Sequence, residues 1–358
     1  MIALRDKRLT HSQMQTVMAC PWKGYLAYGL GLRRETDAKP LRIGSAMHLG
    51  YDLRAKGEPA EQSTLGAIAR YDDQRFTGGD QFSHDIERET VARMLTMYFW
   101  YWQEPDAAIE IVGAEQSFEI PIVNPATSRA SRTFTLAGKI DKIVRLPDGR
   151  LAVMEHKTTS SDLDIGGDYW RRLRIDSQIS IYYMAAQRLG YDVQTVIYDV
   201  VRKPEIRPKQ LPLLDKYNLK IVLDQDGQRV IKKDGVPRQS GDNFRGYKLQ
   251  TRLETPQEYG ERLTNDMAAR PEWYFCRRDV TRTPDDIAES QHDLWHFAKT
   301  LHECDRHGRW PRNTRSCIGF GKCQYFDLCA DRIDVLSGDV PNGFMTVDDV
   351  HQELIEGE

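Results

Sequence analysis

The 358-residue sequence lacks an apolar stretch that could cross a membrane, because its longest uncharged apolar run, Leu95–Trp102, is far shorter than the roughly 20 residues that a span requires. It also opens without a secretory leader, since the charged residues from Arg5 to Arg8 interrupt any apolar core there. We therefore expect a cytoplasmic protein with no membrane segment.

Neither sign of charge is in excess: 50 Lys and Arg residues oppose 53 Asp and Glu residues, for a formal net charge of −3. Any contact with nucleic acid must therefore come from a local basic surface. The sequence has no Gly-x-x-x-x-Gly-Lys-Ser/Thr, which excludes nucleotide hydrolysis at a P-loop. Apolar residues (40%) and charged residues (29%) occur as in ordinary globular proteins, and we find no internal repeat.

The spacing of apolar and turn residues predicts a chain that mixes helices with strands. The expected helices run from Thr10 through Cys20, over Ile43–Lys56, over Asp85–Gln103 (ending before Pro105), over Arg174–Leu189, and onward from an N-cap at Thr283. The expected strands are Val112–Ile122, Thr133–Leu146, Leu151–Lys157 and Val193–Val201. Residues 203–250 read as an irregular insertion with a hairpin around Leu219–Ile231. The last 25 residues carry seven acids and no Lys or Arg, which favours a solvated tail.

Two acidic residues and a lysine lie in the predicted central strands. Asp141 follows Gly138 by three positions in one strand, and Glu155 lies near the end of the next. Antiparallel pairing of these strands can bring the two carboxylates together, and Lys157 projects beside Glu155 because residues i and i+2 share a face. Two carboxylates form a hard oxygen site suited to Mg²⁺ or Mn²⁺, and an ammonium beside them can orient a metal-bound water. This combination of two carboxylates and an ammonium predicts metal-assisted hydrolysis of a phosphodiester.

Each of these residues alone would more simply be a salt-bridged surface residue. The strand argues otherwise, since Leu151–Met154 is an apolar run of buried type, and charges that end such a run are costly unless they are paired or coordinate a metal. Two helices add matching polar residues. His48 follows Gly44 early in one helix, and Gln178 and Tyr182 share a face of another.

These four elements, taken in order, resemble the PD-(D/E)XK nuclease superfamily and, within it, the RecB-like branch. The matching segments are Gly44–His48, Gly138–Asp141, Glu155–Lys157 and Gln178–Tyr182. The proline of the superfamily's name is replaced by Ile140, as is frequent in that branch. The resemblance implies an α/β, restriction-endonuclease-like fold, in which a mixed central sheet is flanked by helices.

The resemblance also implies the roles of individual residues. The metal ligands that it implies are Asp141, Glu155, the carbonyl of His156, and His48. The residues that it places in catalysis are Asp141, Glu155, Lys157, Gln178 and Tyr182. In this scheme the lysine is the base or orients the attacking water, while the glutamine and tyrosine hold the lysine or the DNA strand.

Three of the six cysteines crowd into one C-terminal segment, where five residues separate each from the next. Clustered thiols in a chain without a secretory leader indicate metal ligation more than disulfides. The set resembles the iron–sulfur nucleases of the AddB type and the fourth CRISPR-associated protein. That resemblance implies a four-iron four-sulfur cluster held by Cys20, Cys317, Cys323 and Cys329, which would join both chain ends in a helical annex.

Two alternatives stay open for the cysteines. The family usually has two of its C-terminal cysteines only two residues apart, so the wider spacing here leaves structural zinc as the other metal. Cys304 is the main rival to Cys20 as fourth ligand, whereas Cys276 is expected to be an inert core thiol. The other histidines are expected at the surface or at helix caps: His11, His84, His292, His296, His302, His307 and His351.

Basic and aromatic residues gather before Gln178 and at the start of the insertion. They are Tyr169, Trp170, Arg171, Arg172, Arg174, Arg202, Lys203, Arg207 and Lys209. Such residues can follow a phosphate backbone and stack on the bases of a single strand. A solvated helix start and a charged loop would have the same composition.

We expect one domain over residues 1–333, with a catalytic core at about 43–202, the insertion, and a cysteine segment at about 304–333, before the acidic tail 334–358. The predicted function is Mg²⁺- or Mn²⁺-dependent cleavage of DNA in repair or recombination, beside a helicase or recombination partner. Exonuclease action on single strands or DNA ends is favoured, since a histidine on the helix before the sheet is associated with the exonucleases of this branch. The alternatives are an endonuclease of the same fold and a non-catalytic DNA-binding scaffold subunit.

Overall fold

Six strands form the central sheet of the protein, for which a computed structural model describes residues 4–35, 39–73, 80–319 and 321–355. The strands are β1 (Arg8–Leu9), β3 (Glu110–Val123), β4 (Ala130–Arg145), β5 (Leu151–Thr159), β6 (Val193–Arg202) and β11 (Phe275–Val280). The order is β1-β4-β5-β6-β11, and β3 also pairs with β4. β1–β4 and β5–β6 are parallel pairs and the others are antiparallel, so the sheet is mixed, as predicted.

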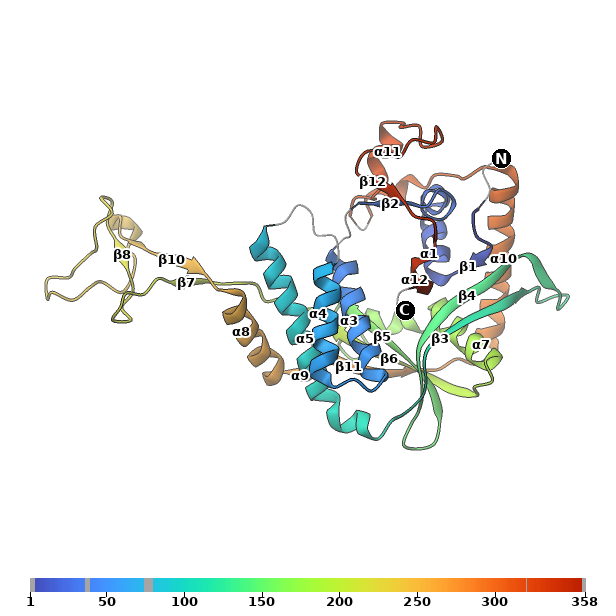
Figure 1. Ribbon diagram of the computed structural model, residues 1–358, viewed down its shortest axis with the longest axis horizontal. Coiled ribbons are helices and arrows are strands. Elements are labelled where there is room, and N and C mark those ends of the chain that lie inside the picture. The colour runs from blue at the N-terminus through green and yellow to red at the C-terminus, as the bar shows by residue number, and fades with distance from the viewer. Residues whose placement is uncertain (1–3, 36–38, 74–79, 320, 356–358) are drawn as a thin grey trace.

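Helices cover both faces of this sheet (Figure 1). One face packs against α3 (Lys39–Ala55), α4 (Ala60–Asp73), α5 (Gln81–Ala107), α8 (Pro256–Ala269) and α9 (Pro271–Tyr274). The other packs against α1 (His11–Ala19), α6 (Asp168–Leu173), α7 (Ser177–Arg188) and α10 (Pro284–His307). The predicted α/β architecture with flanking helices is therefore confirmed. In the part of the chain that the structure describes, no helix is both long and apolar enough to span a membrane.

The two ends of the chain pack together in a smaller cluster. From the N-terminal side come α2 (Pro21–Gly24), the π-helical turn Tyr25–Gly29 and β2 (Leu32–Arg34). From the C-terminal side come the 3₁₀ turn Thr314–Cys317, α11 (Phe326–Ala330), β12 (Phe344–Thr346) and α12 (Gln352–Ile355). β2 and β12 pair antiparallel, and the apolar side chains of both ends share one core.

The prediction of a solvated acidic tail is therefore wrong for residues 344–351, whereas Asp334 and residues 336–340 are exposed. Phe344, Val350 and His351 are buried. Arg33 donates to the carbonyl of Val350 at 2.8 Å, and the guanidinium of Arg34 lies over the ring of Phe344. The acids stay at the surface while apolar residues between them dock, and charge composition alone does not register such anchors.

Residues 203–254, here called the arm, project from the body between β6 and α8 (Figure 1). Its strands are β7 (Gln210–Pro212), β8 (Val222–Leu223), β9 (Lys248–Leu249) and β10 (Thr251–Leu253), with a 3₁₀ turn at Asn243–Arg245. β7 pairs with β10 and β8 pairs with β9. The predicted hairpin is present in part, as a bridge between Leu223 and Arg229.

The arm contains a structural repeat that inspection of the sequence did not find. Three successive turns each place one residue at positive φ, namely Asn218, Gly227 and Gly235. In each turn this residue donates its N–H to the carbonyl three positions earlier. Because Gly and Asn tolerate this backbone conformation, the turns are encoded locally even though the surrounding sequences differ.

Local capping residues set several helix boundaries as predicted. Thr10 caps α1, and Thr283 forms a capping box with Asp286 at the start of α10. The prediction lacks the long helices α4 and α8 as well as several short ones, although Thr255 and Glu258 form a capping box that marks α8.

Two predicted boundaries are wrong. α5 continues through Pro105 to Ala107, because Asp106 forms an ion pair with Arg277 of β11 that holds the last turn against the sheet. The predicted helix Arg174–Leu189 instead begins at Ser177, since Asp176 caps α7 by accepting a hydrogen bond from the N–H of Gln178.

Candidate active site

The site begins where β4 and β5 stop pairing. Their ladder ends at Lys142 opposite Met154, so the next residues toward the open end are Asp141 and Glu155. There the carboxylate of Asp141 accepts a hydrogen bond of 2.9 Å from the backbone N–H of His156. The strand geometry thus brings the two predicted carboxylates to the same sheet end.

Glu155 is almost completely buried, with 2% of its surface exposed. Its Oε1 forms an ion pair with the ammonium of Lys157 and lies 3.3 Å from Nε2 of Gln178. Its Oε2 is buried and has no hydrogen-bond partner among the described residues. One carboxylate oxygen is therefore held in place while the other stays unmatched.

The electrostatics of the site follow from two buried acids, with Lys157 as the cation that acts most strongly on both and Lys142 and Lys139 adding to its effect on Asp141. Burial raises the pKa of Glu155, and the charge of Asp141 raises it further. Burial also raises the pKa of Asp141, and the charge of Lys157 offsets only part of this effect. Burial would lower the pKa of Lys157, but the charges of Glu155 and Asp141 outweigh it and raise the pKa. The site therefore favours an ammonium and carries an excess of negative charge when both acids are ionised.

The first turn of α7 supplies Gln178, and the next turn supplies Tyr182. The amide Nε2 of Gln178 donates to the hydroxyl of Tyr182 at 2.7 Å as well as facing Glu155. The pair contacts Glu155, the same carboxylate that pairs with Lys157, and Tyr182 is only 5% exposed, with its ring packed in the core. That Gln178 and Tyr182 hold the lysine or the DNA strand stays a prediction.

Glycine and histidine at the motif positions have different physical roles. A Cβ atom on Gly138 would lie 2.5 Å from the ring of Phe118 on the neighbouring strand, so β3 can pack on β4 here only because the residue is glycine.

On α3, Nδ1 of His48 lies 3.7 Å from Oδ2 of Asp141, and its side chain is 37% exposed. His48 is therefore at the site and open to solvent.

The side chain of His156 points away from the two carboxylates. Its ring stacks on Tyr51 of α3, with centroids 4.4 Å apart, and its Nδ1 lies 3.4 Å from Oδ2 of Asp199. Asp199 in turn accepts hydrogen bonds from Arg277 Nε at 2.8 Å and from the hydroxyl of Tyr98 at 2.5 Å. The contact of His156 with the two carboxylates is thus made by its backbone N–H, and its carbonyl as a metal ligand stays a prediction.

Sequence reasoning missed several residues beside the site. His11, expected at the surface or a cap, has Nε2 3.7 Å from Oδ1 of Asp176, and burial lowers its pKa. On α3, burial and a hydrogen bond with Glu115 raise the pKa of Asp52 to about 8. No local pattern marks these residues, because separate elements bring them together.

The basic and aromatic residues predicted to follow DNA divide into two groups. Arg171, Arg172 and Arg174 are exposed and precede α7. Trp170 is buried, with its indole N–H donating to Leu163, and Arg202 is buried in ion pairs with Asp162 and Glu205. Trp170 and Arg202 support the fold and do not face a ligand.

A family model described as the PD-(D/E)XK nuclease superfamily matches residues 8–330. The chain belongs to this superfamily. It is 25% identical over 202 residues to a subunit of the ATP-dependent helicase/deoxyribonuclease of Streptococcus equi subsp. zooepidemicus (strain H70), an alignment covering 54% of this chain and 18% of that protein. The like-named protein of Streptococcus agalactiae serotype Ia is 25% identical over 169 residues, or 44% of this chain and 15% of the relative.

The chain thus spans less than a fifth of the length of these curated relatives. Among solved structures, a chain from Eubacterium rectale that is provisionally assigned as an exonuclease aligns with 94% of this chain and 91% of its own length. The TM-score is 0.41 and the sequence identity is 10%.

Four of the cysteines lie where the two ends of the chain meet, namely Cys20, Cys317, Cys323 and Cys329. Asn313 donates its N–H to Cys20 Sγ at 3.4 Å, and Ser316 donates to the carbonyl of Ala19 at 2.6 Å. The N–H of Cys323 donates to the carbonyl of Cys317 at 2.8 Å. Burial raises the pKa of Cys329, and the nearby Cys20 and Cys323 raise it further.

The two rival thiols lie elsewhere. Cys276 and Cys304 pack against the main core, whereas Cys323 packs against the terminal cluster. All six thiols are half-buried and free. Across residues 4–35, 39–73, 80–319 and 321–355, no three His, Cys, Asp or Glu side chains stand grouped closely enough to form a ready-made metal site.

Proposed function

We propose that the chain is a divalent-metal-dependent DNA nuclease that acts through Asp141, Glu155 and Lys157. The observation that carries this proposal is at the open end of β4 and β5, where two largely buried carboxylates have raised pKa values despite the charges of Lys157, Lys142 and Lys139. An uncompensated buried charge costs several kcal/mol, so a purely structural cluster would pair its acids fully. A ligand of positive charge accounts for the arrangement.

The donors present fit Mg²⁺ or Mn²⁺. Both ions prefer carboxylate and carbonyl oxygens, and Oε2 of Glu155 is a buried oxygen without a hydrogen-bond partner among the described residues. We assign Asp141 and Glu155 as ligands, with the carbonyl of His156 and the imidazole of His48 as further ones. When bound, such a metal lowers the pKa of water and polarises the phosphoryl group.

The side chains around the metal would divide the remaining work. The ammonium of Lys157, kept charged by its two acidic neighbours, orients the attacking water and offsets charge on the scissile phosphate. Gln178 fixes Glu155, and the hydroxyl of Tyr182 fixes the amide of Gln178. Gln178 and Tyr182 are thus positioning residues in this proposal.

The specific activity that we assign is exonuclease action on single-stranded DNA or DNA ends, in repair or recombination. Its support is the position of His48 beside Asp141, together with relatives whose name combines a helicase with a deoxyribonuclease. A helicase or recombination protein is the corresponding partner. An endonuclease of the same fold and a non-catalytic scaffold subunit are the alternatives.

End-labelled single-stranded DNA, incubated with the full chain with and without Mn²⁺, tests this function. Wild-type protein should release short labelled products only with the metal, and Lys157→Ala should not. Asp148→Ala in the exposed β4–β5 turn is the matched control and should keep full activity. Cleavage of covalently closed circular single strands would show that the enzyme is an endonuclease. If neither substrate were cleaved, the non-catalytic scaffold subunit would be the remaining alternative.

The cysteines carry a second proposal, a four-iron four-sulfur cluster held by Cys20, Cys317, Cys323 and Cys329. Its support is that the chain ends meet at these residues, and such a cluster would act as a clasp apart from Asp141 and Glu155. Closing so long a loop restrains the unfolded chain by about 5 kcal/mol in the chain-entropy model.

Protein purified without oxygen should be brown and contain about four irons per chain. Cys323→Ala should lose the colour and much of the solubility, whereas Cys276→Ala should keep both. One stoichiometric zinc in colourless protein would replace the cluster by a zinc clasp. If Cys304→Ala lost the metal and Cys20→Ala kept it, the clasp would not include the N-terminus.

A further inference from the structure

The arm differs in charge from the body that carries it. Residues 203–254 contain 12 Lys and Arg residues against 7 Asp and Glu residues, whereas the rest of the chain contains 38 against 46. The arm is therefore a local basic surface on an otherwise acidic protein, which is the electrostatic footprint of a site for a polyanion.

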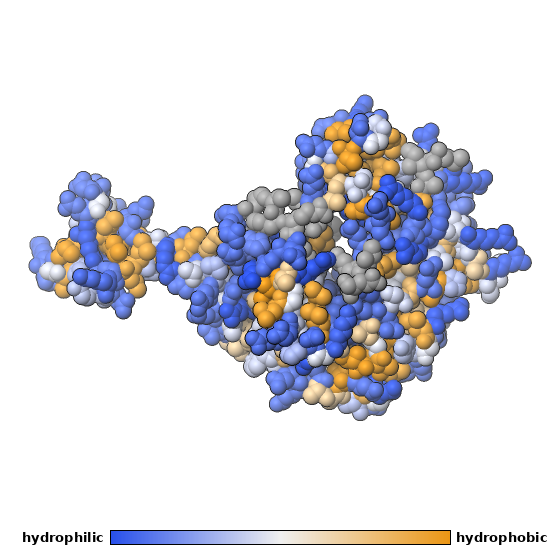
Figure 2. Space-filling view, in the orientation of Figure 1, coloured by the Kyte–Doolittle hydropathy of each residue, from blue (hydrophilic) through white to orange (hydrophobic). Residues whose placement is uncertain are grey.

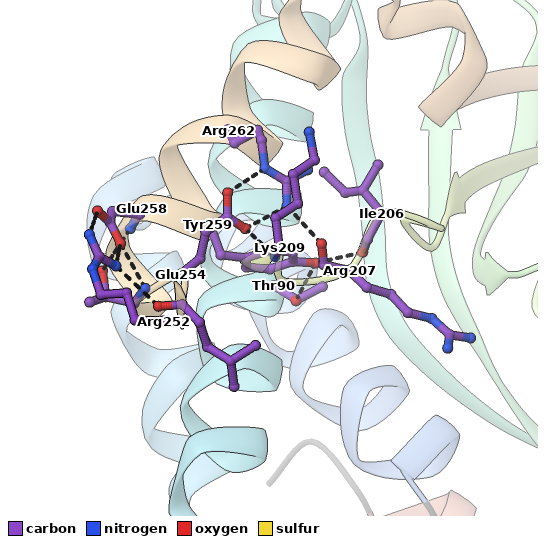
Figure 3. A network of polar contacts seen from close by, with 11 residues as sticks. Thr90, Ile206, Arg207, Lys209, Arg252, Glu254, Glu258, Tyr259 and Arg262 are labelled. Carbon is purple, nitrogen blue, oxygen red and sulfur yellow. Dashed lines mark hydrogen bonds and ion pairs between the residues drawn. The ribbon is translucent and has the colours of Figure 1, made fainter. Parts of the chain in front are cut away.

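The arm is fixed at its base and is not a loose loop (Figure 3). The carboxylate of Glu254, at the returning end, accepts the N–H of Lys209 at 2.9 Å from the outgoing limb. Arg262 of α8 donates to Glu254 at 2.7 and 2.8 Å and to the carbonyl of Arg207 at 2.7 Å. One guanidinium on α8 thus ties both limbs of the arm together.

A second set of contacts ties α8 to the body. The hydroxyl of Tyr259 donates to the carbonyl of Ile206 at 3.3 Å and lies 3.4 Å from the hydroxyl of Thr90 on α5. Arg252 forms two hydrogen bonds of 2.6 Å with Glu258, the residue that completes the capping box of α8. The arm is therefore held at a set position relative to the helices that cover the sheet.

The outer part of the arm has almost no core, since Val222 is the only buried residue described between 203 and 253. Figure 2 shows apolar residues bordered by hydrophilic ones on its visible face. Phe244 is 100% exposed in the 3₁₀ turn, where it supports no packing. A fully exposed aromatic ring at the outer part of a basic element is suited to stack on an unpaired base.

The cations of the arm fall into two classes. Arg229 and Arg238 pair with arm carboxylates, which fixes them in the turns. The second class is exposed and has no ion pair within the described part of the chain; it consists of Lys216, Lys220, Lys232, Lys233 and Lys248. The successive turns distribute these ammonium groups along the arm, as contact with a phosphate backbone requires.

We infer that the arm is a binding surface for single-stranded DNA, in which Lys232, Lys233 and Lys248 contact phosphates and Phe244 stacks on a base. The inference rests on the proposed function and extends it, because α5 and α8 separate the arm from the strands of the site (Figure 1). The arm holds the DNA strand outside the catalytic centre. Charge complementarity favours DNA over a protein partner.

Binding of a long fluorescent single-stranded oligonucleotide to the full chain, in EDTA and over a series of salt concentrations, tests the phosphate contacts. Each lost contact reduces the slope of log K against log salt by about 0.7 on a single strand. The triple variant K232A/K233A/K248A should therefore have a slope smaller by about 2. The matched variant K232R/K233R/K248R keeps the charge and should keep the slope.

The stacking contact is tested separately at Phe244. Phe244→Ala should weaken binding by about tenfold, the scale of one base–aromatic stack, and Phe244→Trp should retain it. Phe244→Leu distinguishes the partner, because a leucine serves an apolar protein contact but cannot stack on a base. Full binding by Phe244→Leu together with an unchanged salt slope in the triple alanine variant would overturn the inference and leave a protein as the partner of the arm.

The outcomes separate the arm from the catalytic site. The triple variant should cleave a short oligonucleotide at the wild-type rate while losing activity on long strands at low DNA concentration. If wild-type protein cleaves DNA and the arm variants bind DNA as well as wild type does, the DNA-binding role of the arm is refuted and the proposed activity is not. Wild-type protein that binds through the arm but cleaves nothing refutes the proposed activity alone.

Discussion

The two faces of β5 carry polar clusters of opposite character. On one face, the pKa values of Glu155 and Asp141 are raised by burial, and the charge of Lys157 offsets this only in part. On the other face, Asp199 is also buried, but burial is outweighed by the Arg277 guanidinium, which holds the pKa of Asp199 below its usual range. Positive charge does not compensate the burial of Asp141 and Glu155, whereas it does compensate the burial of Asp199.

The contrast separates a binding site from a structural brace. Arg277 also pairs with Asp106 and lies over the ring of Trp102, so the Asp199 cluster joins β6, β11 and α5. It holds the ring of His156, and with it the backbone N–H that orients Asp141. Burial alone therefore does not distinguish the two clusters, whereas the direction of the pKa shifts does.

The largest expected effect is on the brace. Asp199→Asn removes the buried one of the two carboxylates that pair with Arg277 and leaves only the more exposed Asp106, and breaking such a buried pair costs about 3–5 kcal/mol of the free energy of unfolding. Urea unfolding monitored by circular dichroism measures this loss. Asp148→Asn in the exposed turn is the control, and equal stability of the two variants would show that the two faces do not differ.

The next effect is on chemistry at the opposite face. Asp141→Asn removes a proposed metal ligand, so the cleavage rate should fall by roughly a hundredfold or more, equivalent to about 3 kcal/mol of barrier. Its urea midpoint should stay at or above that of wild type, because a repelling carboxylate has been removed. An active enzyme, or one as unstable as the Asp199 variant, contradicts the comparison.

A smaller effect is expected at Tyr182. Tyr182→Phe keeps the ring in the core but removes the hydroxyl that accepts the amide of Gln178, a hydrogen bond worth about 1 kcal/mol. The turnover number should drop severalfold, with a melting temperature lower by only about 2–4 °C and an unchanged affinity for DNA. A weaker affinity with normal turnover would restore the view that this tyrosine contacts the strand.

The smallest effect is a difference in pH dependence measured in EDTA. Because the folded-state pKa of Glu155 is raised, its protonated form favours the fold, and this contribution is lost as pH rises through the folded pKa. Glu155→Gln should match wild-type stability at low pH and exceed it at neutral pH, by about 1.4 kcal/mol for each unit of pKa difference. Because the folded-state pKa of Asp199 is lowered, its contribution to stability is lost as pH falls, which is the opposite of the dependence expected for Glu155. If the stability of the Glu155 and Asp199 variants changed with pH in the same way, the two clusters would not differ in charge balance.

The order of the motifs made the strands and their carboxylates predictable. Alternating apolar residues and the turn at Pro147–Gly149 predict β4 and β5, and the i, i+2 rule places Lys157 beside Glu155. Residues that act through long-range contacts could not be found in this way. In the sequence, Asp199 is a single acid in an apolar strand, and its partner Arg277 comes from β11. His11 is likewise a single histidine in a capped helix, and its partner Asp176 lies far away in the sequence.

The sequence by itself determined the superfamily, the mixed sheet, and the residues that line the open end of β4 and β5, because periodicity, capping and motif spacing are local properties of the chain. The tertiary structure alone decided that Tyr182 is buried, that the acidic C-terminal segment docks on β2, and that the insertion is a braced basic arm. These properties depend on which side chains meet across long separations, where burial and pairing set the free energy of each group.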